Sequence, residues 1–320
     1  MPGDRSEPPL RRLPGSLMLV LLPIAAVQVI AATAPAIPSP APGPPSPSLR
    51  FDSARAEWNA PHEPFHIYGN TYYVGVGGLS SILITSSGGD ILIDGDLPES
   101  VPNIVANIRA LGFRVGDIKL ILNSHDHFDH AGGIAALQRM SGARVAASKL
   151  SAQVLEQGHS GPDDPQYGSA PPIAPVRGVQ TVHDGETLHV GSLAITARFT
   201  AGHTPGGTSW TWKSCEQELC VDIVYADSLT PVSADGFLFS NNKGYPGAVD
   251  DFRKSFATLS ALPCDILLTP HPGVSDMWPR LERATHGAGP SAWVDTTACR
   301  RYAQTASENL GKRLASEAGK

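Results

Sequence analysis

The chain contains the stretch Ser124-His125-Asp126-His127-Phe128-Asp129-His130-Ala131-Gly132-Gly133. It holds three histidines and two aspartates within six residues, directly after the apolar run 118–122. Such a short apolar run predicts a strand covered on both faces of its sheet. Alternating side chains on an extended loop point the same way, so His125, His127 and Asp129 can converge. Imidazole and carboxylate groups are ligands for zinc or a similar divalent ion, so a metal site is predicted at the carboxyl end of a strand.

Two further histidines stand in loops that follow predicted strands. His203 lies in Ala201-Gly202-His203-Thr204-Pro205, and His271 lies in Thr269-Pro270-His271-Pro272. With the first cluster they complete six possible ligands: His125, His127, Asp129, His130, His203 and His271. Two ions with three protein ligands each would use all six and keep an open position, which is the catalytic arrangement. The competing interpretation, a solvated loop or hydrogen-bonded core histidines, does not account for so dense a cluster.

Strands and helices alternate along the body of the chain. Period-two and apolar runs predict strands at 71–74, 81–85, 91–94, 118–122, 144–146, 187–190, 193–199, 209–213, 219–225 and 266–269. Apolar spacing predicts helices over 99–111, 132–140, 149–157 and 249–262, and over most of the C-terminal region. The polar, Pro- and Gly-rich stretch 158–178 is long for a loop, which favours a functional lip. The pattern predicts two packed sheets with helices outside them.

The motifs around these histidines resemble those of the metallo-β-lactamase superfamily and, within it, of the subclass B3 metallo-β-lactamases. The matching segments are His125-x-His127-x-Asp129-His130, residues 202–206, residues 225–230 and residues 268–272. The likeness extends over roughly residues 55–310. It implies an α/β (α+β) fold, an αββα sandwich of two mixed β-sheets with helices on the outer faces, formed by residues 49–320.

The resemblance also implies a cofactor and a reaction. Two zinc ions (Zn2+) are expected, the first held by His125, His127 and His203, the second by Asp129, His130 and His271. A zinc-bound hydroxide would attack the β-lactam amide of penicillins, cephalosporins and carbapenems, conferring antibiotic resistance. Asp129 would orient the hydroxide and assist proton delivery. Ser228 and Thr230 would bind the substrate carboxylate, or else simply cap a turn.

One residue departs from a pattern that is common in the superfamily. Many superfamily hydrolases bridge their metals with an Asp in a Gly-Asp-Thr motif, whereas Asp227 stands in Ala-Asp-Ser. Asp227 is therefore either a ligand or, as we favour, a residue that orients others.

Other activities occur on the same scaffold. The alternatives to a β-lactamase are a glyoxalase II-like thioesterase, a lactonase, an iron-dependent oxygenase and a non-catalytic zinc-binding protein.

The first fifty residues differ in composition from the rest. Arg11 and Arg12 precede an apolar run over 13–32, which predicts a secretory signal peptide over 1–34 with its cleavage site undetermined. Gly15, Pro23 and Gln28 interrupt the run, which disfavours a membrane anchor. Residues 35–48 form a Pro-rich linker, and the folded body spans 49–320. A periplasmic location follows from this interpretation.

Four cysteines allow three pairings, and the residues alone leave these open. The resemblance implies Cys215–Cys220, between two predicted strands, and Cys264–Cys299, which would join the C-terminal region to the last strand. Disulfides fit the oxidising periplasm expected from the signal peptide.

Composition excludes several classes of protein. The formal net charge is −6 and no Lys/Arg block occurs, which argues against a nucleic-acid partner. Aromatic residues make up 7% of the chain, and its body has no long apolar span, which argues against a polytopic membrane protein. Small-molecule β-lactams are the expected partners, and we expect a monomer without a stable membrane anchor.

Overall fold

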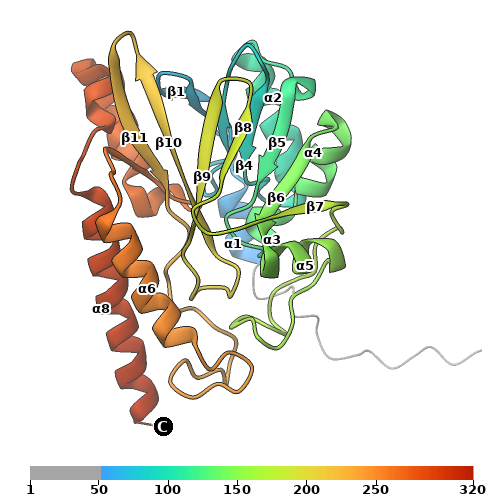
Figure 1. Cartoon of the computed structure of the whole chain (residues 1–320), viewed down its shortest axis with the longest axis vertical. Helices are drawn as coiled ribbons and strands as arrows, with labels where there is room; N and C mark the ends of the chain where they lie inside the picture. The colour runs from blue at the N-terminus through green and yellow to red at the C-terminus, as the bar shows by residue number, and fades with distance from the viewer. Residues whose placement is uncertain (1–51, 320) are drawn as a thin grey trace, which may run out of the picture. The chain divides into compact units, whose positions relative to one another are not determined.

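Two β-sheets lie face to face in the described part of the chain, residues 52–319 of a computed structural model (Figure 1). The seven strands of the first sheet follow one another in sequence order: β1(Phe65–Tyr68), β2(Thr71–Tyr73), β3(Ile82–Ile84), β4(Asp90–Ile93), β5(Ile118–Leu122), β6(Arg144–Ser148) and β7(Val179–Val182). The five strands of the second sheet lie in the order β12(Ile266–Leu268), β11(Leu219–Tyr225), β10(Thr208–Glu216), β9(Leu193–Phe199) and β8(Thr187–Val190). The expected signal peptide and linker, residues 1–48, lie outside the described residues.

Helices cover the outer faces of both sheets. Along the chain they are α1(Asp52–Trp58), α2(Val101–Ala110), α3(Phe128–Ala131), α4(Ile134–Ser141), α5(Lys149–Gln157), α6(Ala248–Ala261), α7(Met277–Arg283) and α8(Ala298–Ala318). In Figure 1, α4 and α5 lie outside the first sheet, and α6 and α8 lie outside the second. Short helical turns η2(Pro98–Ser100), η3(Val115–Asp117), η4(Pro272–Ser275), η5(Ala284–Ala288) and η6(Gly289–Trp293) complete the set. The predicted αββα sandwich is therefore confirmed.

Three apolar layers hold this arrangement together. Leu120 and Leu122 of β5 pack between the sheets, in one cluster with Trp210 and Ile223 of the second sheet. Ile121, on the opposite face of β5, packs in the layer formed with α2, α4 and α5. A third layer joins the second sheet to α6 and α8. Apart from the exposed Lys119, the apolar character of β5 thus reflects burial on both faces.

Strand directions bring the ends of distant segments to one edge. β4, β5 and β6 are parallel, so their carboxyl ends share an edge of the first sheet. In the second sheet β10 runs antiparallel to β9 and β11, and β11 is parallel to β12. The carboxyl ends of β9, β11 and β12 therefore also share an edge. The loops after β5, β9, β11 and β12 are the ones in which the sequence places its histidines and Asp227.

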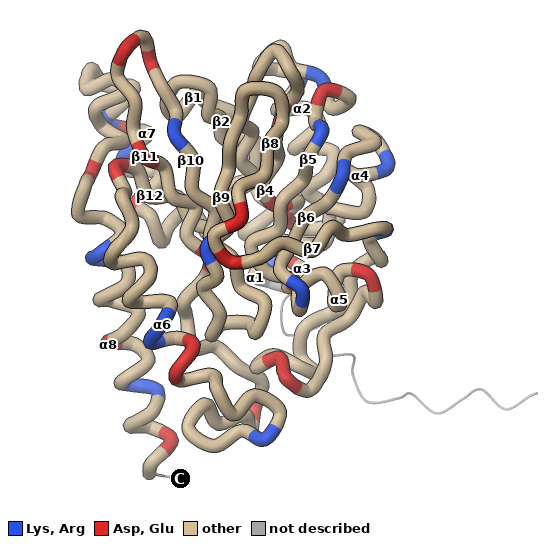
Figure 2. The backbone as a smooth tube through the Cα atoms, in the orientation of Figure 1, with Lys and Arg blue, Asp and Glu red and all other residues tan. Residues whose placement is uncertain are grey.

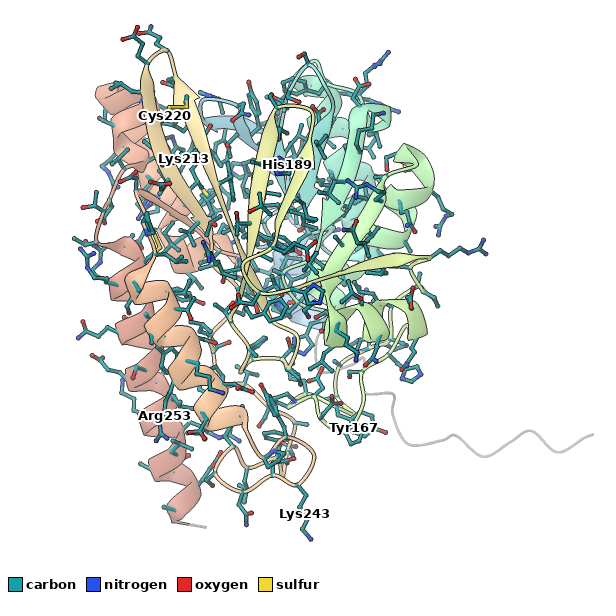
Figure 3. All side chains as sticks on the ribbon, viewed as in Figure 1. Tyr167, His189, Lys213, Cys220, Lys243 and Arg253 are labelled. Carbon is teal, nitrogen blue, oxygen red and sulfur yellow. A yellow bond between two sulfur atoms is a disulfide. The ribbon has the colours of Figure 1, made fainter. Side chains whose placement is uncertain are left out.

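Both expected disulfides are present. Cys215 and Cys220 are register partners in the β10–β11 hairpin. Cys264–Cys299 joins the approach to β12 to the first turn of α8. Figure 3 places Cys220 at the opposite end of the molecule from Tyr167, which belongs to the 158–178 loop.

Charges of both signs are interspersed along α6 and α8 (Figure 2). Among residues 52–319, no helix has both the length and the apolar character needed to cross a bilayer.

Candidate metal centre

The first group of histidines comes from two loops. His125 and His127 follow β5, and His203 follows β9. Their ring centroids lie 4.9 Å apart in each of the three pairs, and one nitrogen from each ring falls within 4.8 Å of the other two. All three residues are buried. The structure therefore brings together the three imidazoles predicted to hold the first zinc.

The second group centres on Asp129, in the single turn α3. Its Oδ2 lies 3.2 Å from Nε2 of His130 and 3.5 Å from Nε2 of His271. The rings of His130 and His271 are 4.9 Å apart, and His130 is 4.4 Å from His125 of the first group. The two groups are thus adjacent, as two neighbouring ions require. His271 is the most exposed of the six, with a third of its side chain accessible.

Electrostatics favour the protonation states that bind a metal at three of the ligands, His125, His203 and Asp129. Burial, followed by the nearby His130, lowers the pKa of His125 well below its usual value. Burial together with His127 lowers the pKa of His203 to about 3. Burial alone would raise the pKa of Asp129, but the imidazoles of His130 and His271 hold it well below the usual range. Neutral imidazoles and an ionised carboxylate are the forms in which these groups coordinate.

The far side of each imidazole in the first group is hydrogen-bonded. Nδ1 of His125 contacts Oδ1 of Asp227 at 2.7 Å, and Nδ1 of His203 donates to the carbonyl of Thr230 at 2.7 Å. Nε2 of His127 contacts both carboxylate oxygens of Asp164, at 3.1 and 3.2 Å. Burial opposes a charge on His127, but Asp164 and Asp126 raise its pKa to about 9. Such outer partners fix a ligand's tautomer and direction.

These residues fit a metal. Nε2 of His125 is buried and has no hydrogen-bond partner within residues 52–319. An unpaired polar atom in the interior is costly, and a cation placed between the three imidazoles would satisfy it. The donor set, nitrogen atoms with one carboxylate, is the one that zinc prefers. Asp227 lies outside both groups because its carboxylate is directed at the back of His125.

The loop after β11 carries the predicted substrate residues. Ser228 is buried, and Oγ1 of Thr230 lies 3.3 Å from Nδ1 of His203. Tyr302 of α8 fixes this loop, since its hydroxyl donates to the carbonyl of Asp227 and accepts from the N–H of Leu229, both at 2.9 Å. Gly207 leaves room for Asp227, because a Cβ at this position would collide with its carboxylate.

Several residues that contact the candidate ligands or fix their loop were not predicted from the sequence. Trp58 of α1 packs its ring 5.3 Å from that of His271, whose Nδ1 lies 3.2 Å from the carbonyl oxygen of Gly78. Asp94, after β4, accepts hydrogen bonds from Oγ of Ser124 at 2.6 Å and from the hydroxyl of Tyr225 at 2.8 Å, which fixes the start of the histidine loop. The position of Asp94 at a parallel strand's carboxyl end is a signal that could have identified it.

The chain belongs to the metallo-β-lactamase superfamily: the profile of the "Metallo-beta-lactamase superfamily" matches residues 74–271. Its similar solved structures include enzymes of subclass B3. It is 54% identical to the Rm3 metallo-β-lactamase, with a TM-score of 0.81, and the match covers 82% of this chain and 98% of that one. It is 52% identical to MEM-A1, a subclass B3 metallo-β-lactamase from a soil metagenome library, with a TM-score of 0.81 and coverage of 82% and 99%.

Curated relatives match over shorter spans. The chain is 31% identical over 121 residues to a hydroxyacylglutathione hydrolase of Rhodobacter capsulatus, which is 38% of each chain. It is 27% identical over 174 residues to the hydroxyacylglutathione hydrolase of Cereibacter sphaeroides, which is 54% of each chain. The chain thus spans 38% and 54% of the length of these two relatives.

Proposed function

We propose that this protein is a zinc-dependent β-lactamase that hydrolyses the amide of penicillins, cephalosporins and carbapenems with two zinc ions per chain. The observation that carries the proposal is the approach of Asp129, His130 and His271 beside a complete group of three histidines. Solved structures 52% and 54% identical to it are described as metallo-β-lactamases, which supports the same substrate class.

The mechanism assigns each side chain a task. Zinc held by the two groups of ligands would supply a water of lowered pKa and a positive centre that polarises the amide carbonyl. Asp129 holds the water in line through its carboxylate, which is ionised between His130 and His271. Oδ2 of Asp129 faces these two imidazoles, so we assign the transferred proton to Oδ1. The oxygen of this water would form the new bond to the carbonyl carbon. As the carbon–nitrogen bond breaks, the proton passes from Asp129 to the departing nitrogen.

Substrate orientation is assigned to the loop after β11. Ser228 lies next to Asp227, and Thr230 lies beside His203, so their hydroxyl groups border the first group of histidines. We assign Ser228 the hydrogen bond to the substrate carboxylate, with Thr230 in support. The hydroxyl of Thr230 also contacts His203, which couples this residue to the metal ligands as well.

Export to the periplasm and a monomeric state complete the proposal. The basic and apolar segments before residue 34 support export, and two disulfides suit an oxidising compartment. A β-lactamase in this compartment would meet its substrates before they reach their targets.

A thioesterase is the second candidate, because the curated relatives named above are hydroxyacylglutathione hydrolases. Their matches cover a smaller share of the chain than those of the β-lactamases. The carboxylate of Asp227 is also directed at Nδ1 of His125, 2.7 Å away, which does not favour a bridging role between two metals.

The test compares substrates on one zinc-loaded preparation of the exported protein. We expect ring opening of a carbapenem, loss of this activity with a chelator, and recovery with added zinc. A glutathione thioester and an acyl lactone are assayed in parallel. Cleavage of the thioester without opening of any β-lactam, by folded zinc-loaded protein, would establish the second candidate instead.

A further inference from the structure

One outer partner of the first group of histidines comes from a segment other than the loop after β11. His125 and His203 are held by the loop after β11, through Asp227 and the carbonyl of Thr230. His127 is instead held by Asp164, which belongs to the irregular loop 158–178. Both oxygens of Asp164 lie within 3.2 Å of Nε2 of His127, and both side chains are almost fully buried.

The carboxylate of Asp164 is itself fixed in place. Its Oδ1 accepts from the N–H of Gln166 at 2.6 Å, and its own N–H donates to the carbonyl of Gly161 at 3.0 Å. A second loop supports this one, since the N–H of Ala234 donates to the carbonyl of Pro165 at 2.8 Å. The first bond holds the carboxylate and the second holds the backbone that carries it, so the side chain keeps its direction without the help of an ion. Asp164 is therefore preorganised toward His127.

We propose that Asp164 is a positioning residue of the metal centre, which fixes the ring of His127 so that Nδ1 faces His125 and His203. The proposal rests on the zinc binding of the proposed function. The hydrogen bond takes up the proton on Nε2, and this tautomer leaves the lone pair of Nδ1 for a metal. Asp227 contacts Nδ1 of His125 and so leaves Nε2 of that ring for the metal. Two carboxylates from different loops thus direct two imidazoles toward one point.

The arrangement couples the 158–178 loop to metal binding. Nε2 of Gln166 lies 3.3 Å from Nδ1 of His127, which is the atom left for the metal. An ion at Nδ1 takes the place of this amide contact, so Gln166 has to give way while Asp164 keeps its bond. If a metal on His127 stabilises the loop through Asp164, contacts that stabilise the loop in this position also strengthen metal binding, because such coupling is reciprocal.

The test measures zinc affinity by competition with a chromophoric chelator, on the full exported protein and without a substrate. Loss of outer partners typically costs about 10- to 100-fold in metal affinity, and we expect that loss for Asp164→Ala. Asp164→Asn keeps an oxygen that accepts from Nε2, so it recovers most of the affinity. Asp163→Asn, the neighbouring carboxylate in the same loop, is the matched control and binds zinc as the wild type does.

A second readout follows the imidazole itself. In the zinc-loaded protein, nitrogen chemical shifts of the histidines report which ring nitrogen of His127 carries the proton. We expect a proton on Nε2 in the wild type and in Asp164→Asn. In Asp164→Ala the ring is free to turn over, and we expect part of the His127 population to coordinate through Nε2 and to carry its proton on Nδ1. A merely structural role of the loop would lower the unfolding midpoint without moving this signal.

The outcomes separate this inference from the proposed function. Wild-type zinc affinity and an unchanged His127 signal in Asp164→Ala would overturn the inference, whatever the enzyme hydrolyses. If the wild type binds two zinc ions but opens no β-lactam, the function fails and the positioning role stands. Should Asp164→Ala not fold, Asp164→Leu at reduced temperature takes its place, and equal affinity in that variant and in Asp163→Asn overturns the inference.

Discussion

Oδ1 of Asp227 lies 2.7 Å from Nδ1 of His125, and both side chains are buried. The two residues are 102 positions apart in the sequence. The contact directs Nε2 of His125, which has no other partner among residues 52–319, toward the remaining histidines. At the superfamily position that often bridges two metals, Asp227 thus contacts His125, and we propose that it orients this imidazole.

Replacement of Asp227 should weaken the first zinc. We expect Asp227→Ala to lower its affinity about 10- to 100-fold, because His125 loses the partner that fixes its tautomer. Asp222→Asn on the same strand β11, paired with Lys213 at the surface, is the control and should leave affinity unchanged. Chelator competition measures both. Tight binding of two ions by Asp227→Ala would show that the contact is dispensable.

Removal of His271 should affect the second metal alone. Without its imidazole, Asp129 and His130 offer two ligands, too few for a stable zinc site. Zinc content after dialysis should fall from two ions per chain to one in His271→Ala. His286→Ala, an exposed histidine in η5, should retain two. Equal zinc content in the two variants would exclude His271 from the ligand set.

Ser228 and Thr230 should differ in their kinetic effects. Loss of one substrate hydrogen bond costs about 0.5–1.5 kcal/mol, so Ser228→Ala should raise KM by roughly 2- to 12-fold with kcat little changed. Thr230→Val should also lower zinc affinity, because its hydroxyl lies 3.3 Å from Nδ1 of His203. Thr230→Ser keeps the hydroxyl and serves as the control. Steady-state kinetics with a penicillin measure KM and kcat of each variant. An unchanged KM in Ser228→Ala would show that this residue does not bind the substrate.

The two disulfides should contribute unequally to stability. Cys264–Cys299 closes a sequence separation of 35 residues, and Cys215–Cys220 one of 5 within a paired hairpin. Loop-closure entropy then predicts a loss of about 3–4 kcal/mol for the Cys264→Ala/Cys299→Ala variant, against about 2 kcal/mol for the hairpin pair. Denaturant unfolding of the zinc-free proteins measures both. The reverse order would refute the chain-entropy explanation.

An ion pair between Asp295, just before α8, and Arg301 on α8 should make the stability depend on pH in the acid range. Hydrogen bonds from Arg301, the largest contribution, and from Thr297 hold the pKa of Asp295 below its usual value, against the effect of burial. Because the folded pKa is depressed, the stabilisation is complete above the unfolded pKa of about 4 and is lost as pH falls toward the folded value. Asp295→Asn should therefore be less stable than the wild type at pH 7, with a difference that shrinks below about pH 4.

Asp250→Asn provides the control for this pH dependence. Asp250 also pairs with an arginine, Arg253, but three quarters of its side chain is exposed, so solvent weakens the pair. The unfolding midpoint should follow the wild-type curve at every pH. A difference between Asp295→Asn and the wild type that is as large at pH 2 as at pH 7 would contradict the assigned cause.

Much of the fold could be predicted because its strands are buried on at least one face. The predicted strands at 118–122, 187–190, 193–199 and 219–225 agree with β5, β8, β9 and β11 in their bounds. Strands β1 and β7 were not predicted. They are short edge strands with one neighbour each and partly exposed residues, so they lack a strong apolar alternation.

In the candidate site, too, some residues could be predicted from the sequence and others could not. Its histidines and Asp129 could be predicted because they follow buried strands whose carboxyl ends meet at one edge. Asp164 could not, because it stands in an irregular loop whose path is set by contacts such as that between Ala234 and Pro165. Tyr302 was missed for a related reason: on an amphipathic helix, a buried tyrosine looks like a core residue until its hydroxyl partners are known.

Hydrolysis of a carbapenem as a function of zinc bound per chain is the measurement that tests the central claim most directly. Zinc is added stepwise to chelated, folded protein while ring opening is followed by absorbance. We predict no activity without metal and a rise to its maximum as the second ion binds. A folded protein that holds two zinc ions per chain and leaves the β-lactam ring closed would contradict the account.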